Sequence, residues 1–396
     1  MKTLFMPLSH DAGIGAATER DGDDWFRGGP LSGRFSKPGI KTRSVRYAML
    51  TALLGWFPLA ILTALQSLVV KDGSFASFIT DYGVLARSLI SAPLLVLGED
   101  ITARHLSILA RYFRDAGPVR EKDQPRFREI VQSTRRLRDS RVTELAMVAI
   151  ALGIAVGESD MPLNLMPAWH HLRGGGSSTA GLWHQFVSLP ILLFLLLGWF
   201  WRLILWARFL FKVSRLDLRL IPSHPDGAAG LKFVGLSLES LSMGPAAMAT
   251  ILAGTIANRV LHMGEGILSF RHPVIEFIVA MLVLVAGPVL FFTPKLMDAM
   301  HHGTLKYGAI ARAVGQQWEQ RWLDDEAASH ALHTADFIST NSLYTLVGRV
   351  YTMRIVPMEI RNLAVVVLAS VVPFIPAALT KISPMTLVRT VSGFFL

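Results

Sequence analysis

Long apolar stretches separated by charged ones form the dominant pattern of this chain. A helix that crosses a bilayer needs about 20 mostly apolar residues, and the pattern predicts seven such helices. The third is the shortest, and it spans a bilayer only if it extends at both ends. The predicted spans cover residues 47–70, 83–97, 145–156, 183–211, 233–257, 274–292 and 362–380.

Helical periodicity continues outside the spans. Apolar residues recur at three- and four-residue steps in 125–145, and 101–113 prolongs the second span, which together predict a helical hairpin near 101–142. A second helical segment follows the sixth span. No strand pattern occurs. We therefore expect an all-α integral membrane protein with about seven transmembrane helices and cytoplasmic helical extensions.

These elements predict a simple order along the chain. Residues 1–46 are rich in Gly, Asp, Ser and Pro, which predicts a disordered cytoplasmic tail without a cleavable signal peptide. Residues 47–292 form a bundle of six spans, and 293–361 form a cytoplasmic helical segment. Residues 362–396 hold the last span and a short interfacial segment.

Composition agrees with a membrane location. Hydrophobic residues make up 52% of the 396 residues and charged residues 17%, against about a quarter in soluble domains. This deficit argues against a soluble enzyme. The chain has no cysteine, which excludes disulfides, thiolate metal sites and cysteine nucleophiles.

The basic residues indicate how the chain is oriented. Lys and Arg number 39 against 29 acids, a net charge of +10, which in a soluble protein would favour nucleic-acid binding. Here the bases concentrate in alternate connecting segments, as the positive-inside rule requires of cytoplasmic ones. We expect the bacterial inner membrane with the N-terminus cytoplasmic and the C-terminus periplasmic, and no nucleic-acid partner. Arg202 and Arg208, near the inner face, are expected to extend towards the interface.

Besides Arg202 and Arg208, three charged residues lie within predicted spans. Glu239 lies in the fifth span, and two interpretations are open. Either it lines a polar pathway through a helix kinked at Gly244-Pro245, or the small residues of this span serve close packing between helices. Arg87 and Glu276, near the outer ends of the second and sixth spans, either pair with each other or form an external ion gate.

The inner connection between the fourth and fifth spans reads S-H-P-D-G-A-A-G-L over 223–231. His224 and Asp226 are able to hydrogen-bond to each other or to ligate a cation. The alternative is a structured turn in which Asp226 caps the fifth helix.

Other acids and imidazoles lie at the same depth, where the second and sixth spans leave the membrane. They predict either a cytoplasmic-face cluster for a divalent cation or proton, or ordinary interfacial residues. The identity of a metal, if one binds, stays open, and no cofactor is expected. The members of this cluster are Glu99, Asp100, His224, Asp226, Asp298 and His301.

Two motifs resemble a group of uncharacterised bacterial multi-pass inner-membrane proteins. That group has an H-P-D-x-A-G-G-L loop and an M-R-x-x-P segment before its last span. Met353, Arg354 and Pro357 match, and Ala229 stands where the pattern has glycine. The resemblance covers residues 80–396 and implies the location and the fold, without an activity.

Three function classes follow from these observations. The first is a conduit for an ion or small solute that uses Glu239. The second is a non-catalytic assembly or sensory protein whose cytoplasmic helices bind a protein partner or a second copy of the chain. The third, a membrane-embedded metal-dependent enzyme, is the least favoured, because the common hydrolase and nucleotide-binding motifs are absent.

Overall fold

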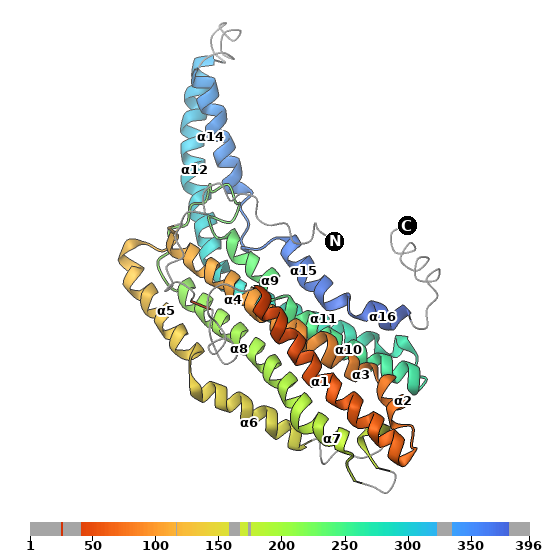
Figure 1. The fold of residues 1–396 in the computed structure, drawn as a ribbon. Coiled ribbons are helices and arrows are strands. Elements are labelled where there is room, and N and C mark those ends of the chain that lie inside the picture. The colour runs from red at the N-terminus through yellow and green to blue at the C-terminus, as the bar shows by residue number, and fades with distance from the viewer. Residues whose placement is uncertain are drawn as a thin grey trace.

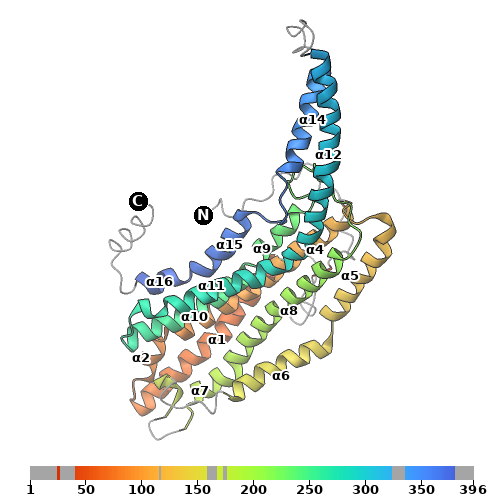
Figure 2. The ribbon, with the colours of Figure 1, turned by 180° about the vertical axis from the view of Figure 1, so that it is seen from behind.

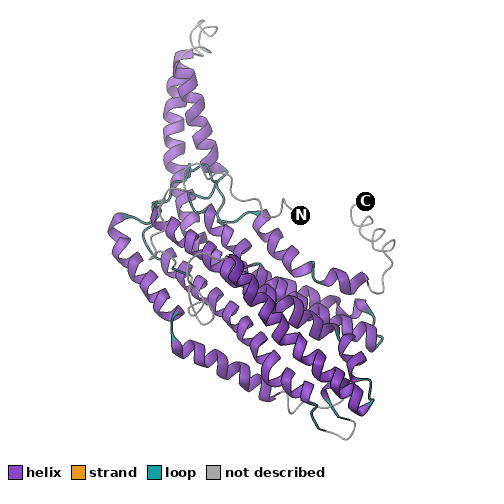
Figure 3. Cartoon of the chain, in the orientation of Figure 1, coloured by secondary structure: helices purple, strands orange, loops and turns teal. Residues whose placement is uncertain are grey.

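The described part of the protein is built from helices. The structure, a computed structural model, describes residues 25–26, 41–115, 117–157, 167–172, 176–322 and 335–379. Within these ranges every regular element is helical, and the remaining β contacts are two isolated bridges (Figure 3). The predicted all-α class is therefore confirmed.

The first half of the chain begins with a long helix and continues through shorter pieces. Two of these pieces, η1 and η6, are π-helical, and the other η elements are 3₁₀ turns. The elements are α1 (Lys41–Val70), α2 (Ser74–Ile79), α3 (Tyr82–Leu85), η1 (Ala86–Ser91), α4 (Ala92–Asp115), η2 (Glu121–Asp123), α5 (Gln124–Arg138), α6 (Arg141–Gly157), η5 (Ala168–His170), α7 (Thr179–Trp183), η6 (His184–Ser188) and α8 (Leu189–Ser214).

The second half continues the bundle and adds the helices that leave it. Its elements are η7 (Lys232–Gly235), α9 (Leu236–Leu241), α10 (Met243–His262), η8 (Ile267–Phe270), α11 (Arg271–Ala286), η9 (Gly287–Phe292), α12 (Thr293–Trp322), α14 (Ala335–Tyr351), α15 (Ile360–Val371) and α16 (Phe374–Leu379).

Several helices are suited to crossing a membrane. Four runs in the described ranges are long and apolar enough, and the bent pair α5–α6 makes a fifth if it counts as one span. This indicates a membrane location and gives four or five candidates where the sequence predicts seven. The predicted second span lies in α3, η1 and α4 and includes Arg87. The predicted last span is interrupted, because α15 has 12 residues and ends two residues before Pro373. The four runs are Ser44–Val70, Thr179–Ser214, Lys232–His262 and Ile267–Gln320.

The two predicted cytoplasmic helical segments differ in form. The hairpin expected near 101–142 does not stand apart: α5 lies against α8, where the ring centroids of Phe127 and Phe209 are 6.1 Å apart. In contrast, α12 and α14 form an antiparallel pair that projects beyond the bundle (Figures 1 and 2). The apolar stripe of α5 is thus buried by the bundle itself.

An aromatic core fills the end of the bundle from which α12 and α14 project. Trp206 and Phe209 of α8 stack with centroids 5.4 Å apart, and Phe113 of α4 stacks on Phe292 at 5.8 Å. Trp25 and Phe26 also belong to this core, with 6% and 2% of their surface exposed. Two residues of the predicted disordered tail are therefore buried, because their rings complete an apolar cluster; the other residues up to 40 lie outside the described ranges. The helix α1 begins at Lys41, inside the predicted tail.

Small residues bring the helices of the outer half close together. A Cβ on Gly254 of α10 would lie 2.6 Å from the Cβ of Ala86 in η1, and one on Gly244 would lie 1.9 Å from the indole of Trp199. Such contacts have no room for a side chain. The small residues of 233–257 thus serve helix packing.

Candidate functional site

The inner loop between α8 and α9 is organised by a single carboxylate. Asp226 accepts hydrogen bonds from the backbone N–H groups of Ala228, Gly230 and Lys232 at 2.9, 3.0 and 3.1 Å. The His224 Nδ1 atom lies 2.9 Å from Oδ1 of the same carboxylate. Burial raises the pKa of Asp226, but the three amides and His224 outweigh it and hold this pKa below its usual range. The loop is therefore a structured turn that ends at the first residue of η7.

The loop is joined to the segment before α15. The backbone N–H of Arg354 donates to the carbonyl of Gly227 at 2.7 Å, and the Lys232 Nζ lies 2.5 Å from Oε1 of Glu359. Ala229 adopts a left-handed φ of 52°, a conformation that favours glycine. The two motifs of the sequence thus meet in space.

The intramembrane acid Glu239 belongs to the same assembly. Its Oε1 accepts a hydrogen bond at 2.9 Å from the Nδ2 of Asn362, which is 4% exposed. Asn362 also accepts from the backbone N–H of Glu359, forming a capping box at the start of α15. The Nε of Arg361 lies 4.0 Å from the Glu239 carboxylate. Glu239 therefore links α9 to α15 and is neutralised locally.

The other inner candidates separate into distinct pairs. Glu99 is paired with Arg202, whose Nη2 lies 3.0 Å from its Oε1 and whose Nη1 donates to the Glu99 carbonyl at 2.5 Å. Arg202 is buried, with 9% of its side chain exposed, so it does not extend to the interface as expected. Its long side chain is held back because the Glu99 carboxylate offers a partner inside the bundle.

Asp100 pairs with Arg104 one turn away and accepts from Ser44 at 2.9 Å. Asp298 lies 3.0 Å from the Nδ1 of His302, and the ring of His301 lies edge-on to His302. Among the described residues no three acids or imidazoles are grouped closely enough to hold a metal ion. The predicted six-residue cluster is thus divided among separate sites.

Of the two candidates predicted at the outer face, Glu276 lies exposed on α11. The Arg87 Nε donates instead to the carbonyl of Gly83 at 3.1 Å. The two residues are placed on different helices, and α3 and η1 pack on α10 rather than on α11. Their pairing is not observed.

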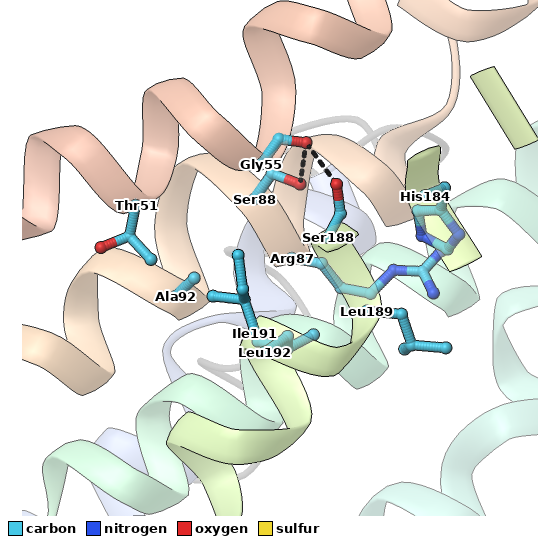
Figure 4. Close-up of a pocket in the computed structure, with 10 residues that line it drawn as sticks. All are labelled: Thr51, Gly55, Arg87, Ser88, Ala92, His184, Ser188, Leu189, Ile191 and Leu192. Atoms are coloured by element: carbon cyan, nitrogen blue, oxygen red, sulfur yellow. Dashed lines mark hydrogen bonds between the residues drawn. The ribbon is translucent and has the colours of Figure 1, made fainter. Parts of the chain in front are cut away.

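Arg87 belongs to a buried polar cluster that the sequence pattern did not indicate. Ser88 and Ser188 both donate to the carbonyl of Gly55, at 3.4 and 3.2 Å. His184 is 5% exposed, and its Nδ1 has no hydrogen-bond partner in the described structure. The cluster lies where α1 meets the two π-helical segments (Figure 4).

The π-helical turns are set by Arg87 and His184 themselves. The N–H of Ala92 donates to the Arg87 carbonyl, and the N–H of Leu189 donates to the His184 carbonyl, each five residues back. Such widened turns occur frequently at functional sites. Serines and a histidine inside apolar runs were the only signal in the sequence, and their meeting depends on helix packing.

The outer end of the cluster is closed by a buried carboxylate. Asp81 accepts from Trp169 Nε1 at 3.0 Å, Asn258 Nδ2 at 2.7 Å and the N–H of Val84 at 3.1 Å. Its two oxygens are thus engaged by three donors, and it begins α3 as its N-cap.

Beside it, His170 packs on the ring of Trp169 with centroids 4.1 Å apart. Burial lowers the pKa of His170 to about 4, and the charge of Arg87 adds to this effect. The imidazole is thus held neutral at physiological pH.

The chemistry therefore divides between the two ends of the bundle. The sites around the α8–α9 loop are paired acids and bases that hold segments together, and the cluster at the other end contains a buried imidazole atom, His184 Nδ1, that no described residue contacts by a hydrogen bond. Comparisons with known protein families, with curated proteins and with solved structures found no match to this chain.

Proposed function

We propose that this chain is a protein of the bacterial inner membrane that binds a cytoplasmic protein partner through the helical pair α12–α14. We further propose seven crossings, with the N-terminus and this pair in the cytoplasm and the C-terminus in the periplasm. The uneven distribution of Lys and Arg among the connecting segments supports the orientation.

The observation that carries the proposal is the projection of α12 and α14 beyond the bundle (Figure 1). The helices are packed tightly on each other: a Cβ on Gly315 would lie 2.6 Å from the Oη of Tyr344. A defined helical pair held away from the rest of the fold has no evident use in supporting the bundle. Exposed elements on a rigid scaffold are common sites of recognition.

The surface of the pair offers apolar contact area along both helices. Leu305 and Ile310 of α12 are 62% and 51% exposed, and Ile338 of α14 is 63% exposed. Apolar side chains of this size, set among polar ones, are typical of helices that present a face to a partner. We name these three exposed side chains, Leu305, Ile310 and Ile338, which lie at different levels along the pair, the hairpin surface.

Site-specific photo-crosslinking in cells tests the proposal. A photoreactive residue at Ile310 is expected to give a discrete adduct with a second protein, whereas one at Leu290, in η9, is the control. The substitution Ile338→Glu should reduce that adduct, and Lys306→Gln, an exposed polar change on the same helix, should leave it unchanged. Absence of any adduct at Ile310, or an adduct that contains only copies of this chain, would contradict the proposal.

A conduit for a small ion is the second candidate function. The observation in its favour is the buried group of Ser88, His184 and Ser188 beside the half-buried Arg87, since polar groups within membrane helices commonly mark ion pathways. A liposome flux assay of wild type beside Glu239→Gln and Arg87→Gln tests it. Flux that Arg87→Gln abolishes would support the conduit, and no flux in wild type would exclude it.

A further inference from the structure

We infer that the cavity between α1, η1 and η6 is a binding site for a single halide ion. Thr51 and Gly55 of α1, Ser88 near Arg87 in η1, and His184 and Ser188 of η6 line it (Figure 4). This site is independent of the hairpin surface, and it would bind its ion whether or not the ion is carried across the membrane.

The hydroxyl groups of the cavity are incompletely used. Ser88 and Ser188 share one carbonyl acceptor, Gly55, at 3.4 and 3.2 Å. Hydroxyl hydrogen bonds are usually about 2.7–2.8 Å long, so both contacts are stretched. Either hydroxyl would form a stronger bond by turning towards an anion in the cavity.

The ionisable groups favour an anion. The guanidinium of Arg87 carries five N–H donors, of which Nε donates to Gly83. The nearby carboxylate of Asp81 is already engaged by three donors and forms no ion pair with Arg87 in the described structure. A cation would be repelled here, whereas an anion would gain a charge-assisted contact.

His184 supplies the second line of support. The imidazole is 5% exposed, faces the cavity beside the guanidinium of Arg87 (Figure 4), and leaves its Nδ1 without a partner in the described structure. A buried polar atom without a partner costs free energy, and an anion in the cavity would remove that cost. With its proton on Nδ1, the imidazole donates to an anion.

The size of the cavity restricts the ion to one atom. Its volume is about 10 Å³, which is about the room that one water molecule needs. Fluoride is close to water in size, and chloride requires a small shift of the apolar side chains. Leu189 and Leu192 close the other side and keep the local dielectric low, which strengthens the contact with Arg87. Oxyanions such as nitrate do not fit.

Isothermal titration of the full chain in nanodiscs tests the site. Fluoride and then chloride are titrated into protein held in sodium gluconate at constant ionic strength. Wild type is expected to show one saturable site. Arg87→Gln should weaken binding at least a hundredfold, and Ser188→Ala about tenfold through loss of one charge-assisted hydrogen bond. Arg271→Gln, which changes an exposed arginine at the start of α11, is the matched control and should bind as wild type does.

The outcomes separate clearly. Absence of saturable binding in folded wild type would mean that the cavity holds water, and it would overturn the proposal. Equal affinity in Arg87→Gln, or nitrate binding as tightly as a halide, would also overturn it. If Arg87→Gln does not elute as a folded species, Ser188→Ala decides, because it removes one oxygen atom and leaves the packing unchanged. The liposome flux assay is separate, so halide binding without flux would support this site and exclude the conduit.

Discussion

Removing the Asp226 carboxylate should release the inner loop while the bundle stays folded. The side chain is 16% exposed and binds three backbone N–H groups within 3.1 Å. In Asp226→Ala these three N–H groups either hydrogen-bond to water or have no acceptor. The loop also loses its contact with His224, while the Lys232–Glu359 ion pair to the segment before α15 remains.

The size of the effect follows from the number of bonds. A hydrogen bond to a charged group contributes about 1.5–3 kcal/mol. The low end applies to each of the three bonds, because water reaches part of this loop. Some of the freed N–H groups will bond to water instead, so the net loss of free energy should be about 3 kcal/mol. Every 1.4 kcal/mol is about a factor of ten, so the local opening constant should rise about a hundredfold.

Hydrogen exchange measured by mass spectrometry checks this value. Peptides covering 221–235 of the detergent-solubilised full chain should lose about two orders of magnitude of protection in Asp226→Ala. Asp298→Ala is the control, because its carboxylate is 73% exposed and surface pairs contribute about 0–1 kcal/mol. Exchange in Asp226→Ala that matches this control would refute the role assigned to the carboxylate.

Four further changes have defined outcomes. Ala229→Gly should raise loop stability by about 0.5–1 kcal/mol in the same exchange assay, because glycine adopts the left-handed φ without strain. Gly254→Ala should lower the melting temperature in detergent by several degrees, corresponding to about 1–3 kcal/mol of overpacking. Arg202→Met should cost about 3–5 kcal/mol by stranding the Glu99 carboxylate, and adding Glu99→Gln should restore part of that loss in a double-mutant cycle. The pKa of His170 in the folded chain, about 4, lies below its ordinary value of 6.5, so protonation of this residue favours the unfolded chain. The free energy of unfolding should therefore be highest above pH 6.5 and fall as the pH drops from 6.5 to 4. The loss should be about 3 kcal/mol, measured by chemical unfolding.

Three of these expectations have a specific result that would oppose them. A slower-exchanging loop in wild type than in Ala229→Gly would mean that the alanine is unstrained. If the double variant Arg202→Met/Glu99→Gln is no more stable than Arg202→Met, the unpaired Glu99 charge is not what destabilises Arg202→Met. For His170, the acid-induced loss must be smaller in His170→Gln than in wild type between pH 6.5 and 4, since other groups titrate in both.

The helical class was predicted well from the sequence, because an apolar run of membrane length satisfies its backbone hydrogen bonds within lipid only as a helix. The predicted count of seven spans is not confirmed, since the described helices give four or five candidates. Arg87 sits within the predicted second span, and Pro373 interrupts the last. Both spans were predicted from the length of an apolar run, which does not show where a helix breaks. Trp25 and Phe26 were assigned to a disordered tail because their neighbours are polar, and an isolated aromatic pair leaves no periodic signal.

The candidate site was only partly predictable. For the H-P-D loop, the alternative of a structured turn anticipated the amide contacts of Asp226, since Asp with nearby glycines is a local turn signal. The pairing of Glu99 with Arg202 joins residues 103 apart, which no local pattern encodes. The same is true of Ser88 and Ser188, whose common acceptor Gly55 lies on a third helix.

The uninterrupted passage from α11 through η9 into α12 has a mechanical consequence. Helical structure runs from Ile267 to Gln320, 54 residues, or about 80 Å at about 1.5 Å per residue. The 3₁₀ segment Gly287–Phe292, with Pro288 at its start, joins α11 to α12 within this run. A load on the distal part of α12 would therefore be borne along this run towards α11, which packs on α15.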